Sequence, residues 1–468
     1  MPQFDLCVIG SGPGGQKAAI QAARLGRSVC VVEKMEFVGG VAINTGTIPS
    51  KALREAVLDV LAARRRGSEA FDALDRRRQL AELAAATQRV VRAEIDIARS
   101  QLVTAGVEIY SGVGSLVDQH TVQVQAARGT QSIHANHILI AAGTTPARPP
   151  GIPFDDVNVI TSDEIIRLPY LPRSMIVVGG GVIGTEYASM LSALGVRVTL
   201  IEGRARVLDF VDAEITEALQ YHLRQAGMTL RLGEQVVRVS LTDPPPSARP
   251  DIYDSMVEAQ LESGKTIRAD SLLYAVGRQG ATDALNLPAV GLEADSRGRI
   301  KVDANYRTGV PTISAVGDVI GFPALASTSM EQGRLAACAM FGQSCPAMTQ
   351  TLPYGIYSIP EISMVGWTEE RLTAENIPYV AGVAHYRETA RGQLLNDQTG
   401  MLKLLIHQDS RVILGVHAIG TGATELIHIG QAVMAFQGTV DYFVETVFNY
   451  PTLAECYKVA AQSGLARL

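Results

Sequence analysis

Apolar and polar positions along the chain repeat one pattern twice. Residues 4–33, FDLCVIGSGPGGQKAAIQAARLGRSVCVVE, predict an apolar strand, a glycine-rich turn, an Ala-rich helix and a second apolar strand that ends in an acidic residue. Residues 174–202, SMIVVGGGVIGTEYASMLSALGVRVTLIE, predict the same succession. Strands that alternate with helices in this way form βαβ units with parallel strands, so the sequence predicts an α/β fold with two such units.

The turn of each unit carries the spacing Gly-x-Gly-x-x-Gly. The first such turn contains Gly10, Gly12 and Gly15, and the second contains Gly179, Gly181 and Gly184. The first glycine permits the tight bend, the second lets the backbone approach a pyrophosphate, and the third lets the helix pack on the strand. An acid, Glu33 or Glu202, follows the third glycine by 18 positions and is placed to bind a ribose. One glycine motif is weak, but two complete units predict two different bound dinucleotides.

A third segment adds to the first of these sites. Residues 311–337, PTISAVGDVIGFPALASTSMEQGRLAA, predict a short strand ending at Gly317 and Asp318, then a loop and a helix. An Asp at a strand end can bind a polyol chain, while the N–H groups of the following helix face a phosphate. A Gly-Asp pair by itself is a common turn. In this context we expect it to close the first site from a distant part of the sequence.

Composition narrows the class of protein. A chain of 468 residues with 47% apolar and 19% charged residues predicts about three globular domains. The net charge of -6 argues against a nucleic-acid or anionic-membrane partner. The arginine runs 64–66 and 76–78 lie in an Ala/Arg/Leu-rich stretch from about 52 to 103, which we interpret as a helical segment with a solvated basic face.

The N-terminus, the apolar runs and the cysteine spacing indicate the cellular setting. Met1 runs almost directly into the first strand, which leaves no room for a signal peptide, and no apolar run is long enough for a membrane span. The five cysteines (positions 7, 30, 338, 345 and 456) lack metal-ligand spacing, and we expect Cys7 and Cys30 to be small core residues. No metal site is predicted, and we expect a cytoplasmic protein.

Several motifs resemble the flavoprotein disulfide reductases, such as lipoamide dehydrogenase and glutathione reductase. Besides the two fingerprints, these are GGVAINTGTIPSKAL (39–53), ILIAAGTTP (138–146), LLYAVGR (272–278), AVGD (315–318), PEISMVG (360–366) and YPTLAE (450–455). The resemblance covers essentially the whole chain. It implies two Rossmann-like domains, for FAD (residues 1–150 and 285–346) and for NAD(P) (151–284), and a C-terminal α+β dimerisation domain (347–468) in a homodimer.

The chain departs from that family where disulfide chemistry occurs. Family members carry two cysteines at the positions of Ala42 and Thr47, and these thiols relay electrons to a disulfide substrate. Neither residue present here can form a thiolate. The family also has a His that moves protons at the thiols, but this chain has Tyr450 at that position and retains Glu455, which orients the His in the family. Thiol relay and proton shuttle are therefore lost together.

The nicotinamide side of the family pattern survives. The resemblance implies that Lys51 and Glu186 form an ion pair beside the flavin, and we expect these two residues to be catalytic. The fingerprints and the resemblance together place the following residues at the cofactor sites: Gly10, Gly12, Gly14, Gly15, Glu33, Lys34, Thr47, Lys51, Ala142, Gly143, Gly179, Gly181, Ile183, Gly184, Glu186, Glu202, Arg204, Arg206, Gly277, Arg278, Gly317, Asp318, Ala326 and Tyr450.

A flavin without thiols must pass its electrons elsewhere. The chain resembles the soluble pyridine nucleotide transhydrogenases of this family in GTIPSKALR, DSRGRIKV, AVGDVIGFPALAS, YSIPEIS and FNYPT. This resemblance implies reversible, ping-pong hydride transfer from NADPH through FAD to NAD⁺. Glu202 suits the 2′-hydroxyl of NAD, whereas Arg204 and Arg206 are either ligands for the 2′-phosphate of NADP or exposed loop charges. The alternatives are an NAD(P)H:quinone or dye reductase and a non-catalytic flavin-binding redox sensor.

Two further segments have structural interpretations. His428 lies in the apolar helical pattern of Leu426, Ile429 and Val433, and we expect it to pack at the dimer interface. Residues 242–251, TDPPPSARPD, predict a surface turn between two strands of the nucleotide domain.

Overall fold

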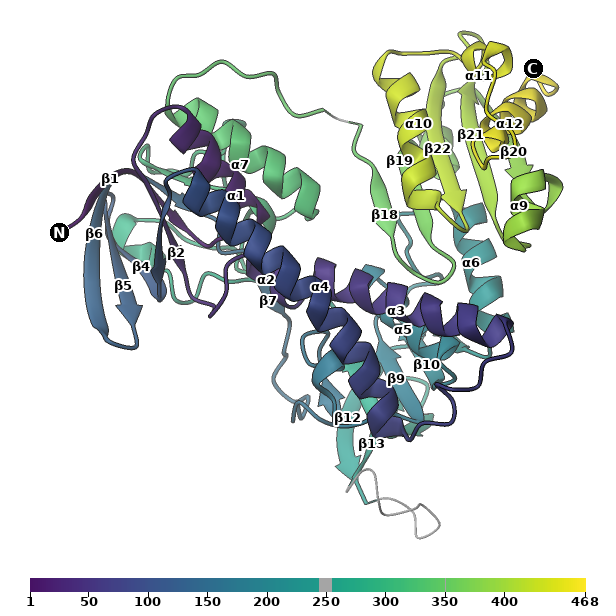
Figure 1. Cartoon of the computed structure of the whole chain (residues 1–468), viewed down its shortest axis with the longest axis horizontal. Helices are drawn as coiled ribbons and strands as arrows, with labels where there is room; N and C mark the ends of the chain where they lie inside the picture. The colour runs from purple at the N-terminus through teal and green to yellow at the C-terminus, as the bar shows by residue number, and fades with distance from the viewer. Residues whose placement is uncertain (244–254, 350) are drawn as a thin grey trace.

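Three large sheets, each with its own helices, organise the chain (Figure 1). The computed structural model describes residues 1–243, 255–349 and 351–468. The predicted turn 242–251 lies almost entirely outside the described residues, between strands β12 (Val236–Thr242) and β13 (Met256–Leu261). None of the helices in the described ranges is long and apolar enough to cross a membrane.

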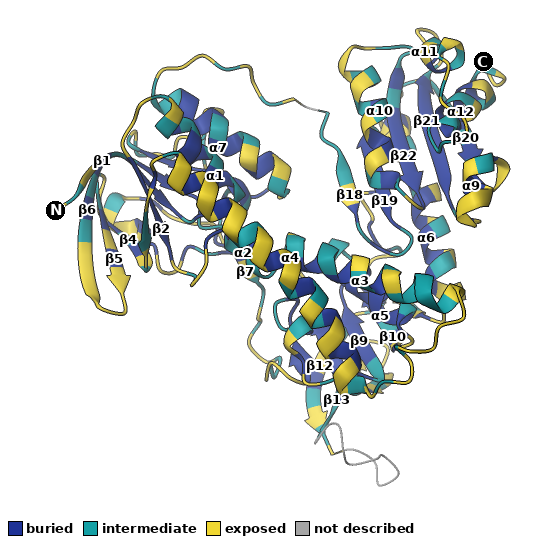
Figure 2. Ribbon diagram, viewed as in Figure 1, coloured by how far each residue is buried: buried dark blue, intermediate teal, exposed yellow. Residues whose placement is uncertain are grey.

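The first sheet joins both ends of the predicted flavin segment. Its parallel part contains β1 (Gln3–Ile9), β2 (Val29–Glu33), β3 (Glu108–Ser111), β6 (Gly129–Ile140) and β17 (Ile313–Ala315), and its antiparallel part adds β4 (Val113–Asp118) and β5 (Thr121–Ala126). β17 pairs with β6 in parallel, so a segment more than 170 positions downstream enters the same sheet. β1 and β2 are largely buried (Figure 2), in agreement with their mostly apolar sequences.

Helices α1 (Pro13–Arg24) and α7 (Ala326–Met340) pack against each other at two glycines. A Cβ atom on Gly14 would lie 3.1 Å from the carbonyl oxygen of Ser329, and one on Gly333 would lie 2.0 Å from the carbonyl oxygen of Gly14. The two backbones therefore approach too closely for any side chain. Gly14, expected only as a cofactor residue, is required for helix packing.

The second sheet contains parallel strands in the order β11-β10-β9-β15-β8. These are β8 (Val159–Ile160), β9 (Ser174–Val178), β10 (Arg197–Glu202), β11 (Thr229–Leu232) and β15 (Ser271–Tyr274), with α5 (Val182–Ala193) and α6 (Ala213–Gln225) packed beside them. An antiparallel sheet of β12, β13 and β14 (Thr266–Ala269) lies next to it, and β7 (Thr144–Pro146) pairs with β16 (Arg278–Gly280) where the chain passes between the two nucleotide folds.

The Ala/Arg/Leu-rich stretch forms two helices rather than one segment. The short helix α2 (Gly40–Asn44) precedes α3 (Thr47–Arg65) and α4 (Arg76–Thr104), whose N-cap Asp75 accepts a 2.9 Å hydrogen bond from the Arg78 N–H. Most arginines of the two runs are exposed, as predicted. Arg64 and Arg76 are exceptions, because each donates to a backbone carbonyl near the second sheet, those of Ala193 and Pro172.

The C-terminal sheet is antiparallel, in the order β18-β19-β22-β21-β20. Its strands are β18 (Tyr354–Ile356), β19 (Ile362–Gly366), β20 (Tyr379–His385), β21 (Met401–His407) and β22 (Ile413–Ile419), and its helices are α8 (Glu369–Ala374), α9 (Ala390–Leu395), α10 (Ala423–Ala435), α11 (Asp441–Glu445) and α12 (Glu455–Leu465). The buried face of α10 contains Leu426, Ile427 and Gly430. His428 is not on this buried face, because the helical period turns it away from the sheet, and it is exposed in the single chain and bonds Gln431. Its packing at a dimer interface stays a prediction.

Candidate active site between the two nucleotide folds

Lys51 and Glu186, 135 positions apart, form an ion pair. The Lys51 Nζ lies 2.8 Å and 2.9 Å from the two carboxylate oxygens of Glu186. Lys51 comes from α3 and is partly accessible, whereas Glu186 comes from α5 and is buried. The ion pair that the resemblance implied is present, and it links α3 to α5 of the second sheet.

A third segment, from the start of the C-terminal sheet, completes the ion pair. The Tyr357 backbone N–H donates to Glu186 Oε1 at 2.8 Å, and the Tyr357 ring centre lies 4.9 Å from the Lys51 ammonium, a cation–π distance. Next to it, the Ile359 N–H donates to the Ser189 hydroxyl at 3.0 Å. Glu186 is thus held by contacts from two different directions.

A second ion pair fixes this segment against α3. Arg54 binds Glu361 at 2.8 Å and donates through Nε to the carbonyl oxygen of Ser358 at 3.2 Å, and both charged side chains are buried. Arg54, Tyr357 and Glu361 were not among the residues predicted for the site. The motif YSIPEIS contains Tyr357 and Glu361, but its sequence does not indicate that this segment packs against α3. That contact spans about 300 positions and exists only in the folded chain.

The glycines of the first fingerprint have two distinct roles. Gly10 has φ +103°, and a Cβ there would lie 2.4 Å from the Ala141 carbonyl oxygen. A Cβ on Gly15 would lie 2.0 Å from the Gly10 carbonyl oxygen. A Cβ on Gly12, by contrast, would come no closer than 4.0 Å to another atom, the Cα of Gly40. The N-terminus of α1, which begins at the next residue, has no side-chain cap. The backbone here is open for a phosphate group.

The polar groups around this turn fit an FAD-type dinucleotide. Buried Glu33 ends β2 and accepts hydrogen bonds from the Ser11 N–H, the Ser11 hydroxyl and the Met35 N–H, which fix its carboxylate at the ribose position. Asp318, after β17, accepts only two long hydrogen bonds, both 3.5 Å, from Thr144 and Ser329. Its carboxylate retains acceptor capacity for a polyol such as the ribityl chain.

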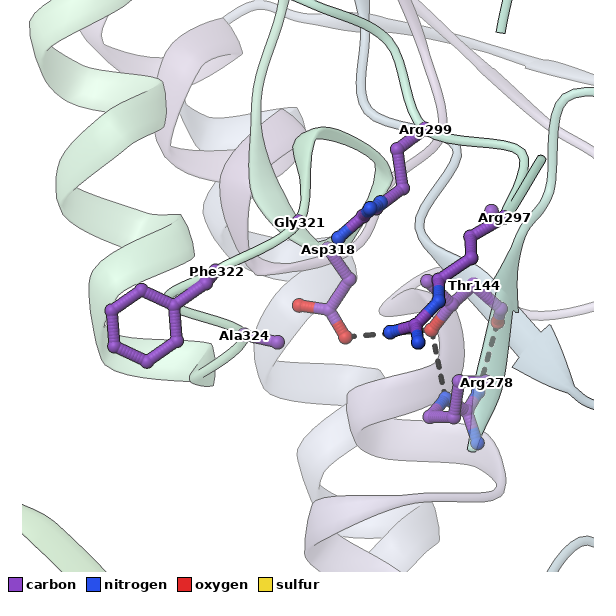
Figure 3. A pocket seen from close by; sticks show the side chains of 9 residues that line it. Thr144, Arg278, Arg297, Arg299, Asp318, Gly321, Phe322 and Ala324 are labelled. Atoms are coloured by element: carbon purple, nitrogen blue, oxygen red, sulfur yellow. Dashed lines mark hydrogen bonds between the residues drawn. The ribbon is translucent and has the colours of Figure 1, made fainter. Parts of the chain in front are cut away.

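A pocket of about 190 Å³ adjoins Asp318 (Figure 3). Arg278 forms one wall and is fixed to Thr144 by hydrogen bonds of 2.7 Å to the hydroxyl and 2.9 Å to the carbonyl oxygen. Arg297 and Arg299 reach the same space from the 293–299 turn. Burial raises the pKa of Asp318 above its ordinary value, although the charge of Arg278 opposes the shift.

The second fingerprint repeats the geometry of the first. A Cβ on Gly179 would lie 2.7 Å from the Ala275 carbonyl oxygen, and one on Gly184 would lie 1.9 Å from the Gly179 carbonyl oxygen. A Cβ on Gly181, in contrast, would meet no atom within 4 Å. Gly179 and Gly184 are therefore required by the turn itself, while Gly181 leaves space beside the uncapped N-terminus of α5.

Glu202 is strongly hydrogen-bonded at the end of β10. Its carboxylate accepts from the Gly180 N–H at 2.6 Å and from the Arg204 N–H at 2.9 Å, and the Arg204 guanidinium binds both oxygens. Burial opposes ionisation, but these bonds outweigh it and lower the pKa of Glu202. Arg204 also pairs with Asp209, and Arg206 pairs with Glu370 at 2.9 Å. Neither arginine is a free loop charge, and each must exchange a carboxylate partner to bind a phosphate.

The remaining predicted residues lie around these two turns or at the surface. Three glycines near strand ends adopt left-handed conformations: Gly143 (φ +66°), Gly277 (φ +84°) and Gly317 (φ +80°). Ala326 is the first residue of α7. Ala142 follows β6, and Ile183 lies in the first turn of α5. Lys34 and Thr47 are exposed, and Ala42 lies within α2, so the expected loop 39–53 is mostly helical. Tyr450 is exposed in the C-terminal part.

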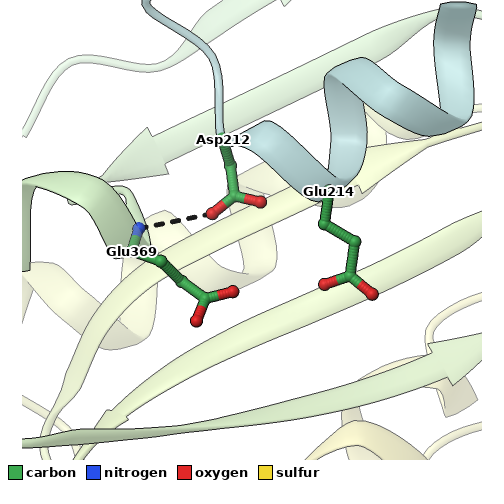
Figure 4. Close-up of side chains that lie close together, drawn as sticks. All are labelled: Asp212, Glu214 and Glu369. Carbon is green, nitrogen blue, oxygen red and sulfur yellow. Dashed lines mark hydrogen bonds between the residues drawn. The ribbon is translucent and has the colours of Figure 1, made fainter.

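One acidic cluster has the spacing of a metal site (Figure 4). Asp212 and Glu214 of the second fold and Glu369 of α8 converge on the fully buried Lys403 Nζ, which lies 2.9 Å from each of the first two and also contacts Glu369. Burial alone would lower the pKa of Lys403, but the carboxylates raise it above its ordinary value. The ammonium satisfies the cluster, which is an electrostatic junction between the second and C-terminal sheets.

Comparisons with known proteins agree with this architecture. Residues 4–333 match the family model described as pyridine nucleotide-disulphide oxidoreductase, and residues 352–461 match the dimerisation domain of the same family. The chain belongs to the pyridine nucleotide-disulphide oxidoreductase family, which confirms the resemblance that its motifs indicated.

Individual relatives indicate a more specific similarity within this family. The chain is 52% identical to the soluble pyridine nucleotide transhydrogenase of Mycobacterium tuberculosis, over 98% of this chain and 97% of the relative, and 43% identical to that of Colwellia psychrerythraea, over 99% and 98%. Among solved structures, LpdA from Mycobacterium tuberculosis superposes with a TM-score of 0.88 at 26% identity, covering 99% of each chain. The flavoprotein disulfide reductase RclA from Escherichia coli gives 0.86 at 25%, covering 98% and 99%.

The two roles of the glycines are separable by substitution. We expect Gly181→Ala to fold with nearly unchanged stability, within about 0.5 kcal/mol, because its methyl group meets no protein atom. That methyl group should nevertheless weaken nucleotide binding about tenfold or more, since it enters the space for the pyrophosphate. Gly184→Ala should instead cost about 1–3 kcal/mol, because its methyl group overlaps a carbonyl. Thermal unfolding and nucleotide titration of both variants check this, and equal effects on stability would contradict it.

Lys403→Met should destabilise the junction by about 3–5 kcal/mol, because it leaves the buried Asp212 carboxylate without its counter-ion. Urea denaturation and hydrogen exchange in α6 and β21 measure the loss. Arg411→Met is the matched control: its partner is Asp441 at 3.1 Å on the surface of the same region, and we expect a change below about 1 kcal/mol. Similar effects of the two substitutions would show that the buried junction is not important for stability.

Proposed function

We propose that this protein is an FAD-dependent pyridine nucleotide transhydrogenase that transfers a hydride reversibly between NADP(H) and NAD(H). The observation that carries the proposal is the Lys51–Glu186 ion pair between the two nucleotide folds, in a chain with Ala42 and Thr47 where disulfide reductases carry cysteines. The names of the relatives at 43–52% identity support the same reaction. We assign FAD to residues 1–150 and 285–346, and the nicotinamide nucleotides to residues 151–284.

The residues of the first fold hold the flavin, and those of the second hold the nucleotide. A bound flavin supplies the redox chemistry by accepting a hydride from a reduced nicotinamide and passing it to an oxidised one. Lys51 provides a fixed positive charge that stabilises negative charge developing nearby, and Glu186 fixes the position of the ammonium. Tyr357 covers the other side of the pair and limits its movement.

One nucleotide site implies a ping-pong order. The second glycine turn, at Gly181, holds one dinucleotide at a time, so NADP⁺ must leave before NAD⁺ binds. The ionised Glu202 favours a ribose 2′-hydroxyl and repels a 2′-phosphate. Arg204 and Arg206 reduce that discrimination, because each can exchange a carboxylate partner for the phosphate of NADP(H). The site can thus accept both nucleotides.

We further propose a cytoplasmic homodimer formed through residues 347–468. The C-terminal part exposes Phe436 (88%), Val447 (89%) and Tyr450 (69%), apolar side chains that a second copy would cover. Nearby, the Glu455 Oε2 atom is buried without a hydrogen-bond partner in the single chain. A polar group of the second copy would satisfy it.

An NAD(P)H:quinone or dye reductase is the alternative that the same site allows, because reduced flavin also reacts with small acceptors. The test is spectroscopic. We expect the purified protein to be yellow, to lose its visible absorbance with NADPH in the absence of oxygen, and to recover it when NAD⁺ is added. Recovery with a quinone at a rate far above that with NAD⁺ would favour the alternative, and a colourless protein would refute both.

Lys51→Met should slow flavin reduction by NADPH about 100-fold while FAD stays bound, because the substitution removes a fixed charge but no phosphate-binding group. Stopped-flow absorbance measures the rate, and the ratio of flavin to protein measures retention. Lys265→Met is the control, since Lys265 forms an exposed pair with Glu234 in the second fold at 3.2 Å. An unchanged rate in Lys51→Met would remove this residue from the mechanism.

A further inference from the structure

Two cysteines outside the candidate active site lie together at the end of α7. Cys338 is in the last turn of that helix and is only 1% exposed, and Cys345 lies in the connection that follows and is partly accessible. The Gln343 N–H bonds the Cys338 carbonyl oxygen at 2.9 Å, which turns the chain back toward α7. Cys345 then contacts Arg334, which lies on the same face of α7 as Cys338, four positions before it.

An arginine is directed at the more accessible thiol. Arg334 lies one helical turn before Cys338, and its Nε and Nη2 atoms bind the carboxylate of Glu331. This fork fixes the guanidinium and leaves Nη1 to donate to Cys345 Sγ at 3.4 Å. A nearby cation stabilises a thiolate, which is the form of cysteine that reacts with oxidants. The negative charge of Glu331 offsets part of this effect.

We propose that Cys345 and Cys338 form an oxidation site, in which Cys345 is the residue attacked by hydrogen peroxide and Cys338 is the resolving residue. The site is independent of the nicotinamide chemistry and of the positions held by Ala42 and Thr47.

The reaction balances with peroxide as the only co-reactant. The Cys345 thiolate attacks one peroxide oxygen, the O–O bond breaks, and the leaving hydroxide takes a proton to become water. The product is a sulfenic acid on Cys345. The Cys338 sulfur then attacks the Cys345 sulfur, the S–O bond breaks, and the departing hydroxide takes the thiol proton of Cys338. Two thiols become one disulfide, and one peroxide becomes two waters.

The geometry assigns the order of the two residues. Burial and the hydrogen bond with Cys345 raise the pKa of Cys338 to about 11, so Cys338 stays protonated until it faces an oxidised neighbour. Cys345 has both access to solvent and the contact with Arg334. The disulfide would tie the end of α7 to the connection that leads to the C-terminal sheet (Figure 1).

The chain contains its own matched control. Cys7 and Cys30 are register partners on the adjacent strands β1 and β2, so they too lie close together, but both are fully buried. Contact with Cys7, together with burial, raises the pKa of Cys30 far above its ordinary value. We therefore expect this second pair to resist peroxide.

The test is to treat the purified full-length protein with hydrogen peroxide, alkylate it in denaturant and map the peptides by mass spectrometry. We expect a peptide linked between Cys338 and Cys345 and free thiols at the other three positions. Cys345→Ser should abolish the link and leave Cys338 unreacted, whereas Cys338→Ser should let Cys345 proceed to sulfinic acid. Arg334→Met should slow disulfide formation about tenfold, and Arg268→Met, which breaks an exposed pair far away, should not.

Three results would overturn the proposal. These are five free thiols after treatment, a disulfide between Cys7 and Cys30 in place of the expected one, or a disulfide between two chains through Cys345 alone. Circular dichroism of each variant before treatment verifies that it is folded.

Discussion

The arrangement of this molecule depends on how one buried carboxylate is satisfied. Glu186 comes from the second nucleotide fold and has no counter-charge on its own helix at this point, so its charge must be met from outside. Lys51 of the first fold supplies the cation, and the Tyr357 N–H supplies a further hydrogen bond. Three segments from different parts of the sequence must therefore meet correctly for this single carboxylate to be paired. The need to neutralise it positions the candidate catalytic residues.

The same principle operates at a second place. Lys403 is completely buried and is stable there because three carboxylates surround it, two from α6 or its N-cap and one from α8. Together with the buried Arg54–Glu361 pair, it joins the C-terminal sheet to the nucleotide folds through specific charge contacts. Breaking such pairs one partner at a time is costly, so they favour one relative placement over others. A single relative placement of the folds is what a hydride-transfer site requires.

The two positions at which the resemblance places the family's cysteines lie in regular helices of this structure. Ala42 fits within α2, and Thr47 begins α3, so both positions continue to support the helix that carries Lys51. The thiols that remain are elsewhere, and the pair at the end of α7 has a cation beside it for reasons that the nicotinamide chemistry does not explain.

The sequence alone determined the local features of this protein. The Gly-x-Gly-x-x-Gly turns, the acids Glu33 and Glu202, and the strand before Asp318 follow from short-range backbone requirements, and the structure places each at the end of a parallel strand. The prediction that thiol chemistry is absent rests on two residue types, Ala42 and Thr47. The family was therefore predictable from motifs.

Tertiary structure alone decided which groups meet. Arg54 with Glu361, the Tyr357 N–H with Glu186, and Lys403 with Asp212 depend on packing between segments that are far apart in the sequence. The packing role of Gly14 against α7 was missed for the same reason. A sequence pattern reports which residues can be buried or charged. The partner that satisfies each one is set by contacts between distant segments, which carry no local signal.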